Sequence, residues 1–160
     1  NNLLSFGESM SKQGVKYTTK VVKCEVRPSE PLCSENLQIE LGSLFLYLCR
    51  VRYVRRRAVM FIESHLNLLA CPGLEKVDFE HESLFAAVER TSRHKIGRSE
   101  MVYTARTAGK VRGGYLECDE HAPVLELDQL VRLDDGTPFE WGSVWLPANR
   151  CVISNETRRA

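Results

Sequence analysis

The sequence predicts an α+β fold built from two pseudo-repeated halves. Three observations lead to this prediction. The 160-residue chain aligns with itself without a gap at a shift of 79 positions. Each half reads as a helix, a strand, a short helix and a hairpin, from the alternation of helical and strand-like residue patterns. Hairpins favour antiparallel pairing, so we expect an antiparallel sheet with the helices gathered on one side of it.

The repeat depends on pairs of positions that keep similar residues in the two halves. These pairs are Phe6 and Phe85, Lys16 and Lys95, Val22 and Met101, Val26 and Ala105, Arg27 and Arg106, Leu37 and Leu116, Phe45 and Val124, Leu46 and Leu125, and Leu48 and Leu127. A repeat of this length implies that two similar halves pack together. The seam between such halves is a natural place for a pocket.

In the first half, capping and turn residues set the limits of the elements. Ser5 and Glu8 match a capping box, and Gly14 fits the position that follows a helix. The segment 28–31 contains two prolines and interrupts the next strand, and Ser29 can cap a second helix. The expected elements are a helix up to Gln13, a strand over residues 15–26, a helix up to about Gln38, and strands over residues 44–53 and 59–66.

The second half follows the same order. The segment Asp134-Asp135-Gly136 is the clearest turn, because Asp-Gly supplies the positive φ that a hairpin needs. Gly113 and Gly114 weaken the short helix. The expected elements are a helix over residues 83–94, a strand over 99–106, a helical turn over 111–118, a hairpin of strands 124–133 and 138–146, and a polar tail over 155–160.

The composition is that of an ordinary globular domain. The formal net charge is +1, so the chain lacks the basic excess typical of nucleic-acid binding. No apolar run approaches the roughly 18 residues of a membrane span, and we expect no membrane association. The chain begins without Met and without a signal-peptide pattern, from which we expect a cytoplasmic domain excised from a longer protein. The six cysteines form no C-x-x-C pair and are interpreted as buried free thiols.

Two arginines continue an apolar strand face. Leu46, Leu48, Arg50 and Arg52 point to the same side of their strand, and the repeat identifies this side as the inner face. A buried guanidinium needs a carboxylate, a phosphate or a water-filled pocket. We favour an anionic ligand, because arginine grips planar and tetrahedral anions through paired N–H donors. An internal salt bridge, or a strand end that has emerged into solvent, is the alternative.

Two glutamates are the candidate polar partners. Glu63 lies on the return strand, on the face shared by Val59 and Phe61. Glu140 takes the position of Phe61 in the repeat, so a carboxylate stands where its counterpart is aromatic. We expect this carboxylate to bond either a ligand hydroxyl group or one of the two arginines.

The inner-face charges are not duplicated in the second half. Gln129 stands at the position of Arg50, and Val131 stands at the position of Arg52. A duplicated scaffold with unequal inner faces is what one asymmetric small-ligand site between the halves would require.

Other functional motifs are missing or weak. The four histidines show no metal-ligand spacing, and the sequence contains no G-x-S-x-G motif, phosphate-binding loop or dinucleotide fingerprint. We therefore expect no metal, no cofactor and no catalytic residue. The basic run Arg55–Arg57 is interpreted as a solvated hairpin turn, with a contact to a partner domain or to a DNA backbone as the alternative.

Five segments carry a further signal in their order and spacing. They are residues 4–14 (compare S-F-[ST]-E-x-M-x-x-x-G), 49–52 (R-x-R), 63–66 (E-x-x-[YL]), 82–85 (x-S-L-Y) and 136–140 (G-x-P-[VF]-E). Together they resemble the UTRA effector domain of GntR-type bacterial transcription regulators of the HutC branch. The resemblance implies a chorismate lyase-like fold, with a six-stranded antiparallel sheet and helices, that forms homodimers. It also implies one effector-binding domain over residues 1–154 and a winged helix-turn-helix domain that is absent from this chain.

The resemblance implies an effector pocket in which the two arginines hold a phosphate or carboxylate. The two glutamates would bind hydroxyl or amine groups. The residues implied to bind the effector are Phe6, Gly7, Arg50, Arg52, Glu63, Ser83, Phe85, Glu140 and Trp145.

Three departures from the family pattern affect the expected ligand. Gly7 stands where Ser or Thr is usual, Phe85 stands where Tyr is usual, and residues 146–151 replace a closing Y-R-x-D-R-[YF] segment. Three polar groups are thereby lost, which adds a less hydroxylated acid to the candidates beside a sugar phosphate.

Three functions are compatible with the sequence. The leading hypothesis is a sensor that binds a small anionic metabolite and controls DNA binding of the full-length dimer. The second is an enzyme of the chorismate lyase type, since that fold also places arginines and a glutamate around a carboxylate. The third is a dimerisation module whose pocket is filled by its own side chains.

Overall fold

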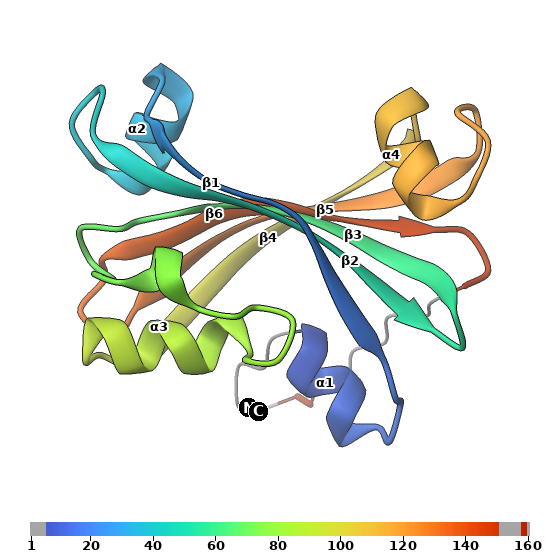
Figure 1. Cartoon of the computed structure of the whole chain (residues 1–160), viewed down its shortest axis with the longest axis horizontal. Coiled ribbons are helices and arrows are strands. Elements are labelled where there is room, and N and C mark those ends of the chain that lie inside the picture. Colours follow the sequence, from blue (N-terminus) through green and yellow to red (C-terminus); the bar gives the residue numbers. More distant parts are fainter. Residues whose placement is uncertain (1–5, 151–157, 160) are drawn as a thin grey trace.

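The computed structural model describes residues 6–150 and 158–159. Its six strands form one antiparallel sheet in the order β1-β2-β3-β6-β5-β4 (Figure 1). The strands are β1 (Thr18–Pro28), β2 (Leu44–Val54), β3 (Arg57–Leu66), β4 (Ile96–Thr107), β5 (Pro123–Leu133) and β6 (Pro138–Pro147). The helices are α1 (Phe6–Lys12), α2 (Pro31–Leu37), η1 (Leu74–Lys76), α3 (Leu84–Ser92) and α4 (Lys110–Leu116). The predicted α+β class and six-stranded antiparallel sheet are confirmed.

The two halves of the sheet repeat each other. From the central β3–β6 pair, the order reads β3-β2-β1 on one side and β6-β5-β4 on the other. The helices α2 and α4, like the strands β2 and β5, begin and end 79 residues apart. The residues after the two helices, Gln38 and Glu117, both adopt left-handed backbone with φ of 53° and 56°. The repeat in sequence is therefore a repeat in structure.

The helices cover both faces of the sheet, so the prediction that they gather on one side is wrong. Figure 1 shows α1 and α3 on one face and α2 and α4 on the other. The reason lies in the strands, because successive residues of β2 are buried on opposite faces. Leu46 and Leu48 pack in the core beneath α3, whereas Phe45 packs against Cys33 and Leu37 of α2. A sheet that is apolar on both faces needs cover on both.

The two hairpins differ in the length of their turns. The β2–β3 turn is the pair Arg55–Arg56, and both residues have positive φ (51° and 64°), as a tight hairpin turn requires. The whole basic run Arg55–Arg57 is exposed at this hairpin, as interpreted from the sequence. The β5–β6 turn has one more residue, Asp134–Gly136, and contains the glycine at φ 89°.

The extra turn residue changes which residues are equivalent in the two hairpins. Arg52 pairs with Met60, whereas Val131, its counterpart, pairs with Glu140. Glu140 therefore occupies the position of Met60, and its predicted equivalence to Phe61 is wrong. Because side chains alternate between faces along a strand, this shift of one residue places the carboxylate on the face covered by α1 and α3.

The ends of the helices α1 and α2 agree only in part with the capping residues predicted from the sequence. Gly14 follows α1 with φ 75°, as expected, while Ser5 lies outside the described residues. The N-cap of α2 is Glu30, and the predicted cap Ser29 instead accepts a hydrogen bond from Ser34 Oγ (2.8 Å). The positions 155–157 and 160 of the predicted polar tail also lie outside the described residues.

Two general expectations concern membranes and thiols. Within the described ranges, no helix is long and apolar enough to cross a membrane.

Five cysteines are described as free thiols: Cys33, Cys49 and Cys71 are buried, Cys118 is half-buried, and Cys24 is exposed. Cys24 thus departs from the prediction of buried thiols, because it lies on the edge strand β1.

Candidate functional site

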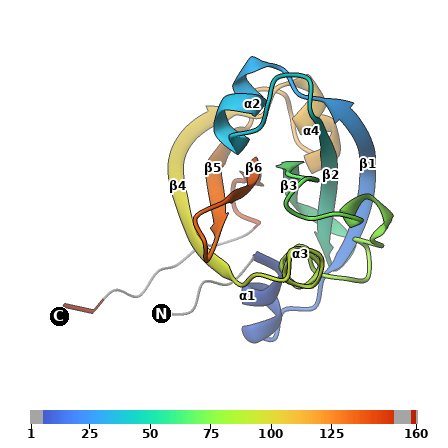
Figure 2. The same ribbon diagram turned by 90° about the vertical axis from the view of Figure 1, so that its left-hand side faces the viewer.

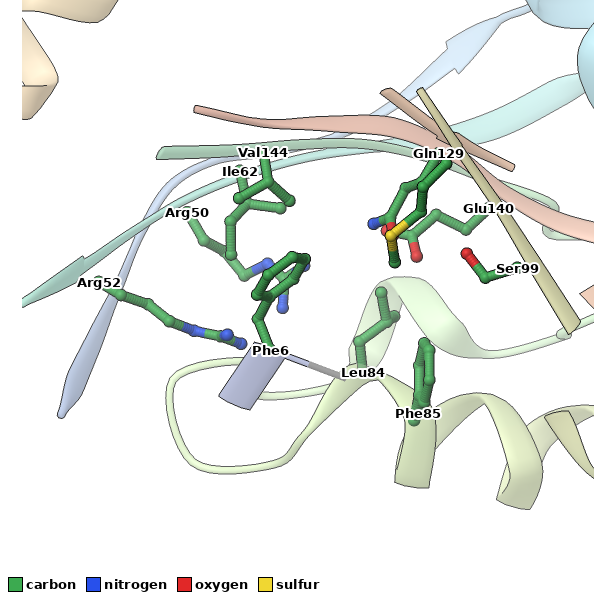
Figure 3. A pocket seen from close by; sticks show the side chains of 11 residues that line it. Phe6, Arg50, Arg52, Ile62, Leu84, Phe85, Ser99, Gln129, Glu140 and Val144 are labelled. Carbon is green, nitrogen blue, oxygen red and sulfur yellow. The ribbon is translucent and has the colours of Figure 1, made fainter. Parts of the chain in front are cut away.

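A small pocket lies between the sheet and the helices α1 and α3, where the two halves meet (Figure 3). Its walls come from both halves, and they include two pairs of repeat-related residues, Phe6 with Phe85 and Arg50 with Gln129. The lining residues are Phe6, Arg50, Arg52, Ile62, Leu84, Phe85, Ser99, Met101, Gln129, Glu140 and Val144. The expected seam between the halves is therefore the position of this pocket.

Two arginines enter the pocket from β2. Arg50 is 3% exposed and Arg52 is 6% exposed. Both lie on the face of β2 that also carries Leu46 and Leu48, as the strand pattern predicted. Burial and the neighbouring Arg52 charge lower the pKa of Arg50 to about 10, so this guanidinium stays charged at neutral pH. Burial also lowers the pKa of Arg52.

Neither arginine has a carboxylate partner within 4.0 Å among the described residues. Arg50 makes one long contact, from Nη2 to Ser64 Oγ at 3.4 Å. Arg52 lies over the ring of Tyr17, with its Cζ 5.1 Å from the ring centroid. The Nε atoms of both arginines are buried and have no hydrogen-bond partner. Buried guanidinium donors without acceptors are costly, so this arrangement suits a site that an anion completes.

One buried carboxylate stands near the arginines without joining them in an ion pair. Glu140 is 2% exposed, and its Oε2 accepts a hydrogen bond from Ser64 Oγ at 2.7 Å. Ser64 thus lies between Arg50 and Glu140. Burial raises the pKa of Glu140, although Ser64 and the two arginines oppose this effect. Two positive charges face at most one negative charge, which leaves the pocket cationic.

The remaining walls are apolar, with two uncharged polar groups on the far side. Figure 3 shows the guanidinium groups on one side of the pocket, with Gln129, Glu140 and Ser99 on the other. Ser99 Oγ is buried and has no hydrogen-bond partner in the described part of the chain. The space left is about 30 Å³, which is room for about one water molecule. A larger ligand therefore requires the lining side chains, or α1 or α3, to move.

Gly7 lies against the end of Arg52, which explains the missing side chain. A Cβ atom at this position would lie 2.5 Å from Tyr17 Oη and 3.1 Å from Arg52 Nη2. A serine or threonine here would push the guanidinium or the phenol away. The departure from the hydroxyl residue usual in the resembling family is therefore coupled to the position of Arg52.

Glu63 and Trp145 do not line this pocket, because they lie on the opposite face of the sheet. Glu63 accepts hydrogen bonds from Tyr47 Oη (3.0 Å) and from Arg112 Nε (2.8 Å). The guanidinium of Arg112 also lies over the ring of Trp145, 3.9 Å from a ring centroid. The structure thus gives Glu63 an internal ion pair. Val59 does not share its face, since it is the extra residue at the irregularity in β3.

The residues at the start of α3 have two different roles. Ser83 is the N-cap of the helix, and its Oγ accepts a hydrogen bond from the backbone N–H of Ala86 at 3.1 Å. Phe85 lies in the pocket wall and packs edge-to-face against Phe139, with centroids 6.0 Å apart. Ser83 therefore serves the helix, while Phe85 joins Phe6 as an apolar wall.

Sequence reasoning missed two serines of the site. Ser64 and Ser99 come from different halves, and neither stands out in its own strand. The available signal was strand parity, since Ser64 shares a face with Ile62, and Ser99 shares a face with Met101. Only the pairing of β3 with β6 brings Ser64 against Glu140.

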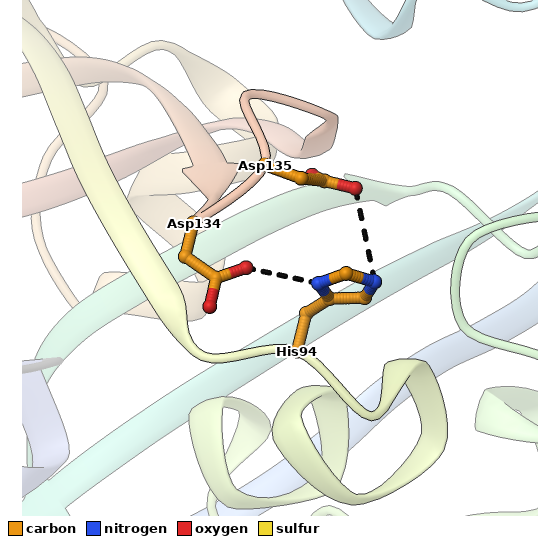
Figure 4. Close-up of side chains that lie close together, drawn as sticks. All are labelled: His94, Asp134 and Asp135. Carbon is orange, nitrogen blue, oxygen red and sulfur yellow. Dashed lines mark hydrogen bonds and ion pairs between the residues drawn. The ribbon is translucent and has the colours of Figure 1, made fainter.

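A second cluster of polar groups lies at the surface near the β5–β6 turn. Figure 4 shows His94 between Asp134 and Asp135, with Nδ1 2.9 Å from Asp134 and Nε2 3.8 Å from Asp135. All three side chains are exposed. The backbone N–H of Lys95 also donates to Asp134 (3.3 Å). We interpret the cluster as a surface contact that fastens the start of β4 to this turn.

The chain is similar to a known protein family. The family model of the UTRA domain matches residues 12–151 of the chain. The HTH-type transcriptional regulator YydK of Bacillus subtilis is 26% identical over 142 residues, which are 84% of this chain and 60% of that protein. The chain therefore spans about 60% of the length of this curated relative.

Solved structures agree with that match. A regulator from Escherichia coli CFT073 is 40% identical with a TM-score of 0.78, over 84% of this chain and 98% of that one. The C-terminal domain of the histidine utilization repressor from Pseudomonas syringae pv. tomato DC3000 is 17% identical with a TM-score of 0.83, over 90% of this chain and all of that one. At 17% identity, the likeness to the Pseudomonas syringae domain shows a shared fold and no more.

Proposed function

Because the chain belongs to the UTRA domain family, we propose that it is the effector-binding domain of a transcription regulator and that its effector is a small anion. The relatives are transcriptional regulators, and YydK is of the HTH type. We infer a single domain over residues 1–154, with DNA contacted only through a helix-turn-helix domain outside this chain. The full-length protein would act as a homodimer in the cytoplasm.

One observation supports the anionic effector above all others. The pocket holds two buried guanidinium groups whose Nε atoms lack acceptors, and the one nearby carboxylate bonds Ser64 instead. A phosphate or carboxylate between Arg50 and Arg52 would supply both charge and acceptors. Phe6 and Phe85 would enclose an apolar body, while Ser99 would bond a polar group at the far end.

Binding is proposed to couple to the position of α1. The empty space of about 30 Å³ is too small for a metabolite, so the bound state differs from the empty state in the packing of the pocket walls, which include Phe6 of α1 and Phe85 of α3. Phe6 belongs both to α1 and to the pocket wall. An effector can shift such an equilibrium only by its different affinities for the two states, typically by about 1–3 kcal/mol.

The proposal is tested by thermal unfolding in the presence of anions. We expect inorganic phosphate or a member of a panel of small mono- and dicarboxylates to raise the unfolding temperature. An anion at 100 times its Kd would add about 2.7 kcal/mol of stability. Native mass spectrometry of freshly purified protein would reveal a co-purified effector.

Two results would contradict this function. An unchanged unfolding temperature across the whole panel, with no co-purified molecule, would favour a dimerisation module with a self-filled pocket. Conversion of chorismate to 4-hydroxybenzoate by the purified chain would make it an enzyme. The relatives are regulators, which supports the expectation that no turnover occurs.

Glu140→Gln should strengthen anion binding and remove the part of its pH dependence that comes from the titration of Glu140. The amide keeps an acceptor for Ser64 and removes the negative charge that faces the anion. Because burial raises the pKa of Glu140, wild-type affinity should increase as the pH falls through that pKa, when the carboxyl becomes neutral. We expect about a 3–10-fold gain at a pH above the pKa of Glu140, where the wild-type carboxyl is charged, which corresponds to about 0.7–1.4 kcal/mol.

Titration calorimetry between pH 5 and pH 8, on wild type and Glu140→Gln, measures this effect. Weaker binding by the variant would mean that Glu140 bonds a hydroxyl or amine group of the effector. That outcome would leave the cationic end of the site intact, because Arg50 and Arg52 are unchanged.

A further inference from the structure

A second and larger hollow lies where α1 leads into β1 and where β2 turns into β3. Its volume is about 1070 Å³, and its walls are the segments 14–18 and 53–56. Figure 1 shows α1 at this end of the sheet, and Figure 2 shows α1 and α3 together on the same side of the sheet. The hollow therefore lies beside the pocket that these two helices cover.

One aromatic ring separates the hollow from the pocket. The ring of Tyr17 lines the hollow, and Arg52, which lines the pocket, lies over this ring with its Cζ 5.1 Å from the centroid. A Cβ atom at Gly7 would lie 2.5 Å from Tyr17 Oη, so α1 touches the same side chain. Both spaces share one apolar cluster, which contains Val15 and Val54 of the hollow and Phe6, Ile62 and Val144 of the pocket. A movement of the Tyr17 side chain would therefore join the two spaces.

The cover of the pocket is held less firmly at α1 than at α3. Of its seven residues, α1 buries Gly7 and Met10. By contrast, α3 buries Leu84, Ala87 and Val88 in one apolar core cluster. A smaller buried apolar surface gives a smaller free energy of local opening. The structure therefore favours opening at α1 and its neighbour Tyr17, next to the hollow, over opening at α3.

All charged side chains in the described walls of the hollow are basic. They are Lys16, Arg55 and Arg56, which form the basic mouth of the hollow, and all three are exposed. Arg52 and Arg50 continue the series of positive charges into the pocket. A cleft lined by charges of one sign focuses the electric field and attracts ions of the opposite sign, which raises association rates by roughly 10–1,000-fold. The hollow is thus suited to collect anions for the two buried arginines.

We propose that anions enter the pocket through this hollow, that the basic mouth attracts them, and that Tyr17 is the gate. This route rests on the proposed function, because the anion is the ligand of that site. The incoming anion takes the place of the Tyr17 ring beside Arg52, and the ring turns away into the hollow. Since Tyr17 also touches α1 at Gly7, its displacement changes the packing of this helix.

The route is tested with a reporter thiol in the pocket and two thiol reagents of opposite charge. Ser99→Cys places the thiol on the far side of the pocket from the arginines. The background carries Cys24→Ser, Cys118→Ser and Cys151→Ser, which leaves the three buried cysteines in place. The reagents are 2-sulfonatoethyl methanethiosulfonate, an anion, and 2-(trimethylammonio)ethyl methanethiosulfonate, a cation. Each modification rate is divided by the rate of the same reagent with free 2-mercaptoethanol.

Removal of two charges from the basic mouth should slow the anionic reagent selectively. We expect Arg55→Gln combined with Arg56→Gln to lower the anionic rate by about 3–10-fold at low ionic strength, and to raise the cationic rate. The difference should shrink at about 0.5 M salt, because salt screens exposed charges. Arg93→Gln combined with Lys110→Gln is the matched control. It removes the same charge at exposed positions outside the hollow, and Arg93 shares the positive φ of the turn residues.

Removal of the gate should speed both reagents alike. We expect Tyr17→Ala to raise both rates by about 10-fold, because the ring no longer stacks on Arg52. Tyr17→Phe keeps that ring and should keep the gate closed. Val15→Ala is the control for lost packing, since Val15 lines the same hollow and belongs to the same apolar cluster but does not lie against Arg52. Circular dichroism and thermal unfolding would show that the variants are folded.

Two outcomes would overturn this route. An anionic preference that survives the double substitution at Arg55 and Arg56 would assign the preference to the buried arginines alone. A rate for Tyr17→Ala no higher than that for Val15→Ala would mean that molecules reach the pocket by another path. Neither measurement uses the effector, so its failure would leave the anion site standing. Conversely, an absence of stabilisation by every anion tested would contradict the proposed function without changing these rates.

Discussion

Arg50→Gln is expected to stabilise the empty protein and to weaken effector binding strongly. The substitution removes a buried charge that has no carboxylate partner, and glutamine already occupies the equivalent position, Gln129, on the other side of the pocket. We expect the free energy of unfolding to rise by about 1–3 kcal/mol, because the substitution removes part of the desolvation penalty of a buried charge that has no carboxylate partner. Loss of a buried charge-assisted contact to the effector costs about 2–5 kcal/mol, or at least about 30-fold in affinity.

Thermal unfolding and titration calorimetry with the anion that stabilises wild type would measure the two effects together. Arg57→Gln is the matched control, since it makes the same chemical change at an exposed position in the turn region. The two readouts separate the alternatives left open by the sequence. If Arg50 served an internal salt bridge, the variant would be less stable than wild type, and anion binding would change little.

Gly142→Ala is expected to cause the largest loss of stability. Gly142 lies in β6 opposite Ser64, in the central pair of strands. A Cβ atom there would lie 2.3 Å from the carbonyl oxygen of Glu63 and 3.2 Å from the Cα of Ser64. Both neighbours are backbone, so the two halves must separate locally. We expect a loss of about 3 kcal/mol, the upper end of the usual range for overpacking, and a fall in unfolding temperature of about 6–12 °C.

Gly114→Ala is the control for this substitution. Gly114 is exposed within α4, and no atom lies within 4 Å of a Cβ built there. Alanine should therefore stabilise the helix by about 0.5–1 kcal/mol. Differential scanning calorimetry of the two variants measures both changes. An unfolding temperature for Gly142→Ala within about 2 °C of wild type would show that the central strands accommodate a methyl group at this position.

The sequence predicts which arginines line the candidate site, but it does not predict which carboxylate lies beside them. Arg50 and Arg52 were identifiable because both continue a face that Leu46 and Leu48 mark as buried, and period-two alternation holds within one strand. Their lack of a carboxylate partner was not identifiable, since it depends on where Glu140 lies. Glu63 looked equally suitable in sequence, yet its partner Arg112 comes from α4 on the other face.

The sequence by itself determined the class of the fold, its duplication, and the buried arginines on one inner face. These properties are local, because strand parity, turn chemistry and an ungapped repeat need no knowledge of the packed structure. Only the tertiary structure decided which carboxylate shares the pocket. One additional turn residue moves Glu140 to the pocket face, and the pairing of β3 with β6 brings Ser64 to it. A shift of one residue reverses every side chain of a strand, so the contents of the site depend on the register between strands.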